Sequence, residues 1–219
     1  MQSDNEQYRS TATLNVREAP TTSAKMLGRL SVDDVIEKIG TSEDGNWIKF
    51  MHNGVEGWSS KKFLKKVPYI PPPGEDFPWM VIAEKEKGVS EIPGSGNSPR
   101  VLEYLKSTTN LSRSAASRDE TPWCSAFVNW CLEQAGYERT KHAAATSWRD
   151  WGQAINTPRR GCIVVLKREG GGHVGFYIEE TKTHVKVLGG NQQNLETKIF
   201  EVSEKYFPKS ELLGYRIPK

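Results

Sequence analysis

Short apolar stretches separated by polar turns fill the first third of the chain. Between about Tyr8 and Val67 the apolar residues come in small groups, and Gly-Asn or Asn-Gly pairs lie between the groups. The clearest groups are Val35, Ile36 and Ile39, then Trp47, Ile48 and Phe50, then Val55 and Trp58. Stretches of this length, broken at glycine and asparagine, are typical of short strands joined by tight turns. The pattern predicts a small all-β barrel.

Prolines crowd the segment that follows. Residues 67–78 contain five of them, namely Pro68, Pro71, Pro72, Pro73 and Pro78. Such a composition favours extended polyproline conformation and forms a semi-rigid spacer. We therefore expect a β domain over residues 1–67, a proline-rich linker over 68–78 and a second domain over 79–219.

Apolar residues at helical spacing begin after the prolines. The longest predicted helix spans Thr121 to Ala135, with Thr121 as N-cap, Pro122 at the first helical position and Gly136 after its end. Shorter helices are predicted over 79–87, 99–105 and 143–151, and strands over 162–166, 173–178, 184–188, 197–202 and 213–217. Because the helices precede the strands, the second domain is expected to be α+β.

Composition narrows the class of protein. The 219 residues are 36% hydrophobic and 26% charged, and no apolar stretch approaches the roughly 18 residues of a membrane-spanning helix. We therefore expect no membrane insertion. The net charge of +3 is spread along the chain, apart from Lys61, Lys62, Lys65 and Lys66, so a nucleic-acid partner is not expected. A mildly basic surface suits an anionic polymer such as the bacterial cell wall. Residues 1–10 are polar and show no signal peptide.

The chain has three cysteines: Cys124, Cys131 and Cys162. Cys124 and Cys131 lie on one predicted helix, where seven positions separate their Cα atoms by about 10 Å, too far for a disulfide. The sequence has no CxxC pair and no clustered histidine and cysteine ligands. We therefore expect no structural zinc, no other metal and no cofactor.

Cys124 occupies a position where a thiol can be reactive. It falls in the first turn of the predicted helix, where the partial positive charge of the helix N-terminus favours a thiolate. A free backbone N–H of that turn, that of Cys124 or Ser125, is a candidate donor to an oxyanion. The alternative is that Cys124 fills the apolar stripe of the helix, the role we expect for Cys131.

A nucleophilic thiol needs a base, and His173 is the leading candidate. It follows three glycines and opens a predicted strand, on which Gly175 shares its face and leaves space beside the ring. His184, at the start of the next strand, is the rival base. Asn191, in a predicted turn after that next strand, is the candidate to orient the imidazole. Each of these residues also has an ordinary structural interpretation.

Several other side chains are candidates for contact with a substrate. Trp123, Ser125, Glu91 and Asn97 are expected to line a cleft near Cys124, although Glu91 and Asn97 also suit a turn or cap. The tryptophans Trp123, Trp148 and Trp151 suit either a platform for sugar or peptide, or the core. Trp47 and Trp58 suit either a ligand groove or the core of the first domain.

A set of short motifs follows in one order along the second domain. It consists of Glu91-Ile92-Pro93-Gly94, Asn97-Ser98-Pro99-Arg100, residues 121–130, Ala145-Thr146-Ser147-Trp148, Trp151-Gly152, Pro158-Arg159-Arg160-Gly161, Gly172-His173-Val174-Gly175-Phe176, Leu188-Gly189-Gly190-Asn191-Gln192 and Gly214-Tyr215-Arg216. Together these motifs resemble the CHAP and NlpC-type papain-like peptidases and amidases of bacteria and phages. In the first domain, Leu14-Asn15-Val16-Arg17, residues 45–49 and residues 54–58 resemble a bacterial SH3-like domain.

The resemblance implies a papain-like fold in which Cys124 is the nucleophile and His173 the base. Asn191 is similar to the third polar residue of the CHAP arrangement, a position where related families have His or Glu. One departure is Cys162, where the family often has Asp. We assign Cys162 no catalytic role.

The implied function is hydrolysis of a peptide or amide bond in peptidoglycan, by an endopeptidase or an N-acetylmuramoyl-L-alanine amidase. We expect peptidoglycan as the partner, a monomeric protein, and a location in the cell wall, the periplasm or outside the cell. Two alternatives stay open: a thiol deamidase or transpeptidase acting on protein, and a non-catalytic protein that binds cell wall.

Overall fold

The structure, a computed structural model, describes residues 6–168 and 171–219. The chain forms two compact units, Met1–Ile70 and Pro71–Lys219. Among the described residues, every helix is too short or too polar to span a lipid bilayer.

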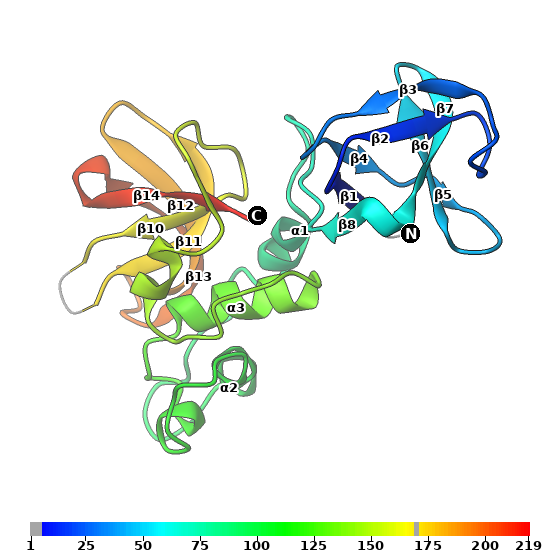
Figure 1. Ribbon diagram of the computed structural model, residues 1–219. Helices are drawn as coiled ribbons and strands as arrows, with labels where there is room; N and C mark the ends of the chain where they lie inside the picture. The colour runs from blue at the N-terminus through cyan, green and yellow to red at the C-terminus, as the bar shows by residue number, and fades with distance from the viewer. Residues whose placement is uncertain (1–5, 169–170) are drawn as a thin grey trace. The chain divides into compact units, whose positions relative to one another are not determined.

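The first unit consists of short antiparallel strands (Figure 1). One sheet has the order β4-β1-β8 and the other the order β3-β2-β7-β6-β5. The strands are β1 (Gln7–Ser10), β2 (Leu14–Arg17), β3 (Met26–Leu30), β4 (Val35–Glu37), β5 (Gly40–Thr41), β6 (Trp47–His52), β7 (Val55–Ser60) and β8 (Leu64–Val67), with a 3-10 turn at Lys61–Phe63. Asn53 and Gly54 both have positive φ between β6 and β7, as a two-residue type I′ hairpin requires.

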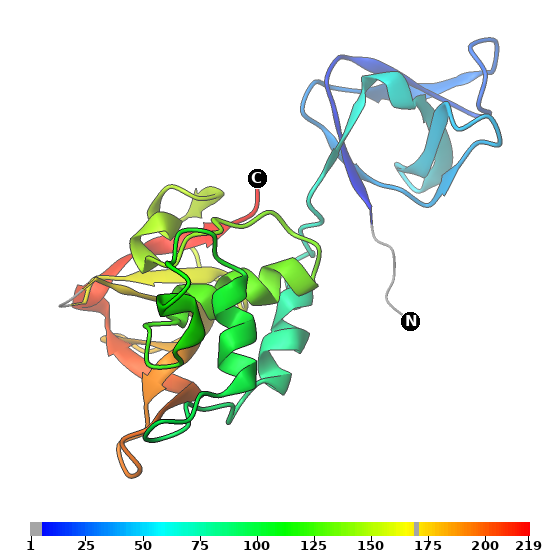
Figure 2. The ribbon, with the colours of Figure 1, turned by 90° about the horizontal axis from the view of Figure 1, so that it is seen from below.

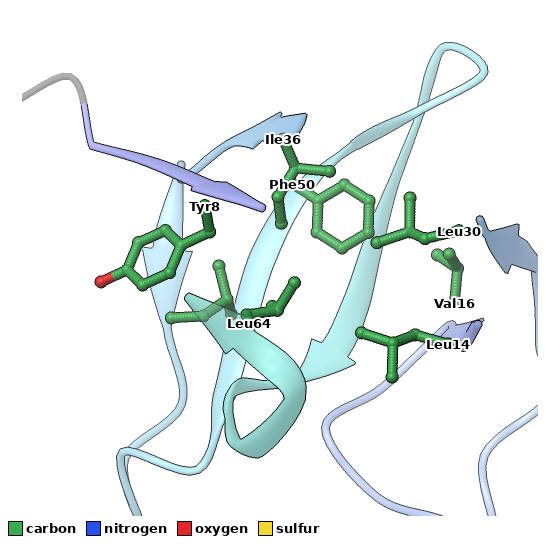
Figure 3. Packing of buried hydrophobic residues seen from close by; sticks show 8 residues of the cluster. Tyr8, Leu14, Val16, Leu30, Ile36, Phe50 and Leu64 are labelled. Carbon is green, nitrogen blue, oxygen red and sulfur yellow. The ribbon is translucent and has the colours of Figure 1, made fainter. Parts of the chain in front are cut away.

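An aliphatic and aromatic cluster fills this unit (Figure 3). Its buried members are Tyr8, Leu14, Val16, Leu30, Ile36, Ile48, Phe50 and Leu64. Strand β6 shows how the sequence builds it, because Ile48 and Phe50 point inward while Trp47 and Lys49 alternate outward. Trp58 is also half-buried and lies outside the cluster, with the Lys49 ammonium 5.7 Å from the centroid of its ring.

The second unit has helices gathered on one side of a six-stranded antiparallel sheet (Figure 2). The helices are α1 (Pro78–Lys85), α2 (Pro99–Lys106) and α3 (Cys124–Gln134), with 3-10 turns at Ala115–Ser117, Ala145–Arg149 and Lys209–Glu211. The strand order is β13-β12-β11-β10-β14-β9. The strands are β9 (Gln153–Ile155), β10 (Ile163–Leu166), β11 (His173–Glu180), β12 (His184–Gln193), β13 (Phe200–Pro208) and β14 (Leu212–Ile217).

Helix α3 packs on β11 and β12, which makes it the element that joins the helical layer to the sheet. The rings of Phe127 in α3 and Phe176 in β11 contact each other with centroids 6.0 Å apart. Val174 and Phe176 share this face of β11, and alternation puts His173 and Gly175 on the other.

Strand β13 is longer and later than the predicted strand over 197–202, and β9 is not predicted from the sequence. Three further differences lie near Cys124 or in β12. Helix α3 begins at Cys124 rather than after Thr121, because the Thr121 hydroxyl donates to the carbonyl of Ala115 instead of capping the helix. Residues 143–151 form a 3-10 turn at Ala145–Arg149 rather than an α-helix. Residues 189–192 continue strand β12 rather than forming a turn.

Candidate active site

Cys124 is the first residue of α3. The N-cap is Trp123, which has no side-chain capping hydrogen bond, and the first backbone bond of the helix runs from the Phe127 N–H to the Trp123 carbonyl at 2.9 Å. The N–H groups of residues 124–126 therefore precede the helical bonding pattern and point out of its end. Cys124 as a whole is 6% exposed. This geometry offers a nucleophile and backbone donors at one place.

Burial raises the pKa of the Cys124 thiol above its ordinary value. The backbone N–H groups of Val174 and Ser125 act in the opposite direction, and so does the positive charge of Arg168. These opposing effects mean that the thiol reaches the backbone of β11 at residue 174, and that a thiolate formed there would meet amide donors from both the helix and the strand.

His173 opens β11 and is 1% exposed. Its ring packs against Phe207 of β13, with centroids 5.1 Å apart. Burial, together with the charges of Arg168 and Lys205, lowers the pKa of His173 to about 3, and the side chain of Gln192 opposes this fall. The imidazole is therefore neutral near pH 7 and able to accept a proton.

The structure brings the two candidate groups to the same end of β11. The thiol of Cys124 lies at the backbone of Val174, immediately after His173. The ladder between β11 and β12 begins only at the pair Phe176 and Leu188, so it does not include residues 173–175. Cys124 approaches from the helix side and alternation puts the His173 ring on the opposite face, so a proton passing between them has to go around this end of the strand, which is not paired with β12.

Two glycines of β12 make room at this point. A Cβ at Gly189 would lie 3.2 Å from His173 Nε2, whereas a Cβ at Gly190 would collide with the ring of Trp123. The glycine pair therefore allows the imidazole to pack on one face of β12 and the indole to pack on the other.

A β-bulge decides which residue faces the imidazole. The register with β13 shifts between Gly189 and Gln192, and Asn191 has a φ of 57°. The extra residue reverses the alternation of side chains, so Gln192 rather than Asn191 shares the side of Gly189 and His173. Gln192 is 2% exposed, and a Cβ at Gly189 would lie 3.5 Å from its side-chain amide. The sequence predicts a turn here, with Asn191 as the residue that orients the imidazole.

The Gln192 amide is oriented by backbone carbonyls. Its Nε2 donates to the carbonyl of Gly189 at 3.0 Å and to that of Ser203. Its Oε1 and the His173 Nε2 are both buried and have no hydrogen-bond partner among the described residues. Both atoms belong to side chains that lie beside Gly189, and in the described structure both are left without a partner there.

Trp123 and Ser125 have buried side chains whose polar groups are already bonded. The Trp123 ring is fully buried and its N–H donates to Glu91 Oε1 at 2.9 Å. The Ser125 hydroxyl donates to the carbonyl of His142 at 2.6 Å and accepts from the Trp148 N–H at 2.8 Å. Both side chains hold the start of α3 in place, and only the backbone N–H of Ser125 faces the thiol.

Glu91 and Asn97 belong to one loop that precedes the site in sequence. Asn97 Oδ1 accepts the N–H of Asp119 at 2.9 Å, and Asp119 Oδ2 accepts the N–H groups of Ile92 and Ser98 at 2.9 and 2.7 Å. Asn97 is thus a turn residue that fastens the loop. Burial raises the pKa of Glu91, the Trp123 N–H opposes this rise, and the charges of Asp119 and Glu120 add to it.

The remaining candidates lie elsewhere. His184, the rival base, is at the far end of β12, where it pairs with Pro208 and its Nδ1 bonds Thr183. Cys131 and Cys162 are fully buried, and burial raises the pKa of Cys162 to about 12. Within residues 6–168 and 171–219, no three His, Cys, Asp or Glu residues are grouped so that they could hold a metal ion.

Comparison with known proteins agrees with the motifs. The family model "Bacterial SH3 domain" matches residues 12–65 and the model "CHAP domain" matches residues 116–191. No curated protein matches the chain. Among solved structures, NlpC1 from Trichomonas vaginalis is similar at 13% identity and a TM-score of 0.36, covering 96% of this chain and 68% of its own. An NlpC/P60 family protein from Bacillus cereus ATCC 10987 is similar at 14% identity and a TM-score of 0.36, covering 97% and 63%.

The two family matches follow each other in the order that the motifs predict, and the second unit has the expected α+β architecture. The chain therefore consists of a bacterial SH3 domain followed by a CHAP domain.

Proposed function

We propose that the CHAP domain hydrolyses a peptide or amide bond of peptidoglycan, with Cys124 as nucleophile and His173 as base. The observation that carries this proposal is the thiol at the first residue of α3, within reach of the amides of Val174 and Ser125 and next to His173 along β11. The CHAP match supports a hydrolase of this class.

We expect the Cys124 thiol and the His173 imidazole both to be neutral before the reaction, because burial raises the pKa of the thiol and lowers that of the imidazole. His173 accepts the proton of Cys124 as the sulfur attacks the carbonyl carbon of the amide. Backbone N–H groups at the end of α3 stabilise the oxyanion. His173 then protonates the departing amine, leaving a thioester. A water molecule, deprotonated by His173, cleaves the thioester to a carboxylic acid and restores the thiol.

We further propose that Gln192, and not Asn191, positions the base. Its Nε2 is engaged by the carbonyls of Gly189 and Ser203, so its Oε1 is left to accept a hydrogen bond from His173 Nε2. That bond selects the tautomer with a proton on Nε2 and leaves Nδ1 free to take the proton of Cys124.

In this proposal the SH3 domain attaches the protein to cell wall, and the protein acts at the wall or outside the cell. Its half-buried tryptophans Trp47 and Trp58 lie outside the hydrophobic cluster and so offer ring surface for binding.

The test is digestion of purified peptidoglycan followed by mass spectrometry of the soluble products. Wild type is expected to release new fragments, and Cys124→Ala to release them at least about a thousandfold more slowly. Cys131→Ala is the matched control, since it removes a thiol two turns deeper in the same helix. Free amino groups on stem residues would indicate an endopeptidase, and intact stems separated from glycan would indicate an amidase.

Identical product profiles from wild type and Cys124→Ala would overturn the catalytic proposal. If both proteins also sediment with the cell wall, the result would favour a non-catalytic protein that binds the wall.

A further inference from the structure

Two cationic residues lie on segments of the chain that adjoin His173. Arg168 is in the connection between β10 and β11, whose closing pair is Leu166 and His173, and its carbonyl accepts the N–H groups of Gly171 and Gly172 at 3.3 and 3.2 Å. Lys205 is in β13, two residues before Phe207, whose ring packs on His173. Alternation puts Lys205 and Phe207 on one face of the sheet.

Neither cation is neutralised by a carboxylate within the described parts of the chain. Other lysines of the same sheet have carboxylate partners: Lys186 pairs with Glu204 at 2.7 Å, and Lys209 with Glu180 at 2.9 Å. Within residues 6–168 and 171–219, neither Arg168 nor Lys205 takes part in an ion pair. Arg168 is exposed and Lys205 is half-buried, so both can meet a ligand.

The charges of these residues reach the reacting groups. Arg168 acts to lower the pKa of both the Cys124 thiol and His173, and Lys205 acts to lower that of His173. The field at the site is therefore positive on the side of β11 and β13. The opposite holds beside Trp123, where Glu91 lies near Asp119 and Glu120.

We propose that Arg168 and Lys205 form a subsite for a carboxylate of the substrate, close to the carbonyl that Cys124 attacks. This inference rests on the proposed function. It names the substrate class more closely: stem peptides that keep a free carboxylate next to the scissile bond, in preference to stems in which that carboxylate is an amide. A guanidinium and an ammonium that form no ion pair with the described residues match a carboxylate in charge, and the guanidinium also matches it in geometry.

Alkylation of Cys124 tests the subsite without any assumption about the scissile bond. Iodoacetate carries a carboxylate beside the carbon that the sulfur attacks, while iodoacetamide carries an amide there. In both reactions a C–S bond forms and iodide leaves with the electron pair of the broken C–I bond. The rates are measured on the full chain, and mass spectrometry of peptides identifies Cys124 as the labelled thiol.

The ratio of the iodoacetate rate to the iodoacetamide rate is expected to fall roughly two- to fivefold in Arg168→Gln, and further in the double variant with Lys205→Gln. Lys167→Gln is the matched control, because it removes the same charge from the adjacent exposed position. Added salt is expected to lower the wild-type ratio as well, since it screens the attraction of the anion. Equal ratios in wild type, Arg168→Gln and the double variant would overturn the subsite.

A second experiment separates this inference from the proposed function. One batch of peptidoglycan is divided, and the carboxylates of one half are converted to amides with a carbodiimide and ammonium. Wild type is expected to digest the untreated half faster, and Arg168→Gln to lose most of that preference. Equal digestion of both halves by wild type would sink the subsite and leave the hydrolase standing. No digestion of either half would count against the hydrolase.

Discussion

Among the described residues, the buried polar side chains of the SH3 domain are serine hydroxyls, whereas those of the CHAP unit include carboxylate, amide and imidazole groups. Among the described residues, the buried polar side chains of the first unit are Ser10 and Ser59. Those of the second are Glu86, Ser98, Ser107, Thr108, Asp119, Ser125, Asn129, His173 and Gln192. Buried ionisable and amide groups are costly unless they are bonded, so a unit that keeps them is organised around a particular arrangement.

This difference shows which parts of the molecule hold the candidate catalytic groups in place. In the first unit, alternation of strand residues is enough to fill the interior (Figure 3). In the second, the buried polar groups fix the start of α3, the loop before it and the bulge in β12. These are the three places that surround Cys124 and His173.

The sharpest test of this contrast is the stability cost of removing one buried polar side chain from each unit. Asn129 Nδ2 donates to the Ser125 carbonyl at 2.9 Å and its Oδ1 accepts the Lys141 N–H at 2.7 Å. Asn129→Ala is expected to lower the free energy of unfolding by about 3 kcal/mol, because it leaves several buried groups unpaired. Ser59→Ala, which removes one bond to the Asn15 carbonyl, is expected to cost about 1 kcal/mol. Urea unfolding gives both values, and equal costs would contradict the contrast.

The next test concerns the bulge. Gln192→Leu is expected to lower kcat roughly tenfold to a hundredfold with little change in KM, because the tautomer of His173 is no longer fixed. Asn191→Gly, which tolerates the φ of 57°, is the control and should change kcat by less than about twofold. A larger loss in Asn191→Gly than in Gln192→Leu would show that Asn191 positions the base. Thermal unfolding of both variants separates an effect on the base from loss of the fold.

Acid sensitivity should also separate the two units. The folded pKa of His173 is about 3, below the unfolded value near 6.5, so the unfolded state binds the proton first as pH falls. Stability from this residue is complete above pH 6.5 and is lost progressively down to pH 3. Between pH 7 and 5 the CHAP unit should lose about 2 kcal/mol through His173.

Hydrogen exchange followed by peptide mass spectrometry reports the two units separately. At pH 5 the loss of protection, corrected for intrinsic exchange rates, should appear in residues 71–219. In the variant His173→Gln this loss of protection at pH 5 should largely disappear. An equal loss in that variant would assign the sensitivity to another group.

The smallest expected effect lies in the SH3 domain. Trp58→Ala is expected to weaken sedimentation with insoluble peptidoglycan by about threefold to fivefold, because it removes a half-buried ring from the surface. Hydrolysis of a soluble peptidoglycan fragment should not change. Val55→Ala, at an exposed position of the same strand, is the control. A loss of hydrolysis on soluble fragments in Trp58→Ala would contradict a pure binding role.

The sequence by itself determined the elements and the main motif of this protein. Glycine and asparagine turns, alternating apolar residues and the helical stripe after Pro122 are local signals, and they predicted the β barrel and the α+β unit. The Cys124 and His173 motifs were equally visible, because the segments that carry them are short and continuous.

Tertiary structure alone decided which side chains meet. Whether Thr121 caps the helix depends on the carbonyl of Ala115 in the preceding 3-10 turn, and whether Trp123 is a platform or core depends on the space left by Gly190. The bulge in β12 arises from its pairing with β13, and it exchanges Asn191 for Gln192 beside the imidazole. Each outcome is a contact between one segment and another, and the periodicity within a segment carries no information about such contacts.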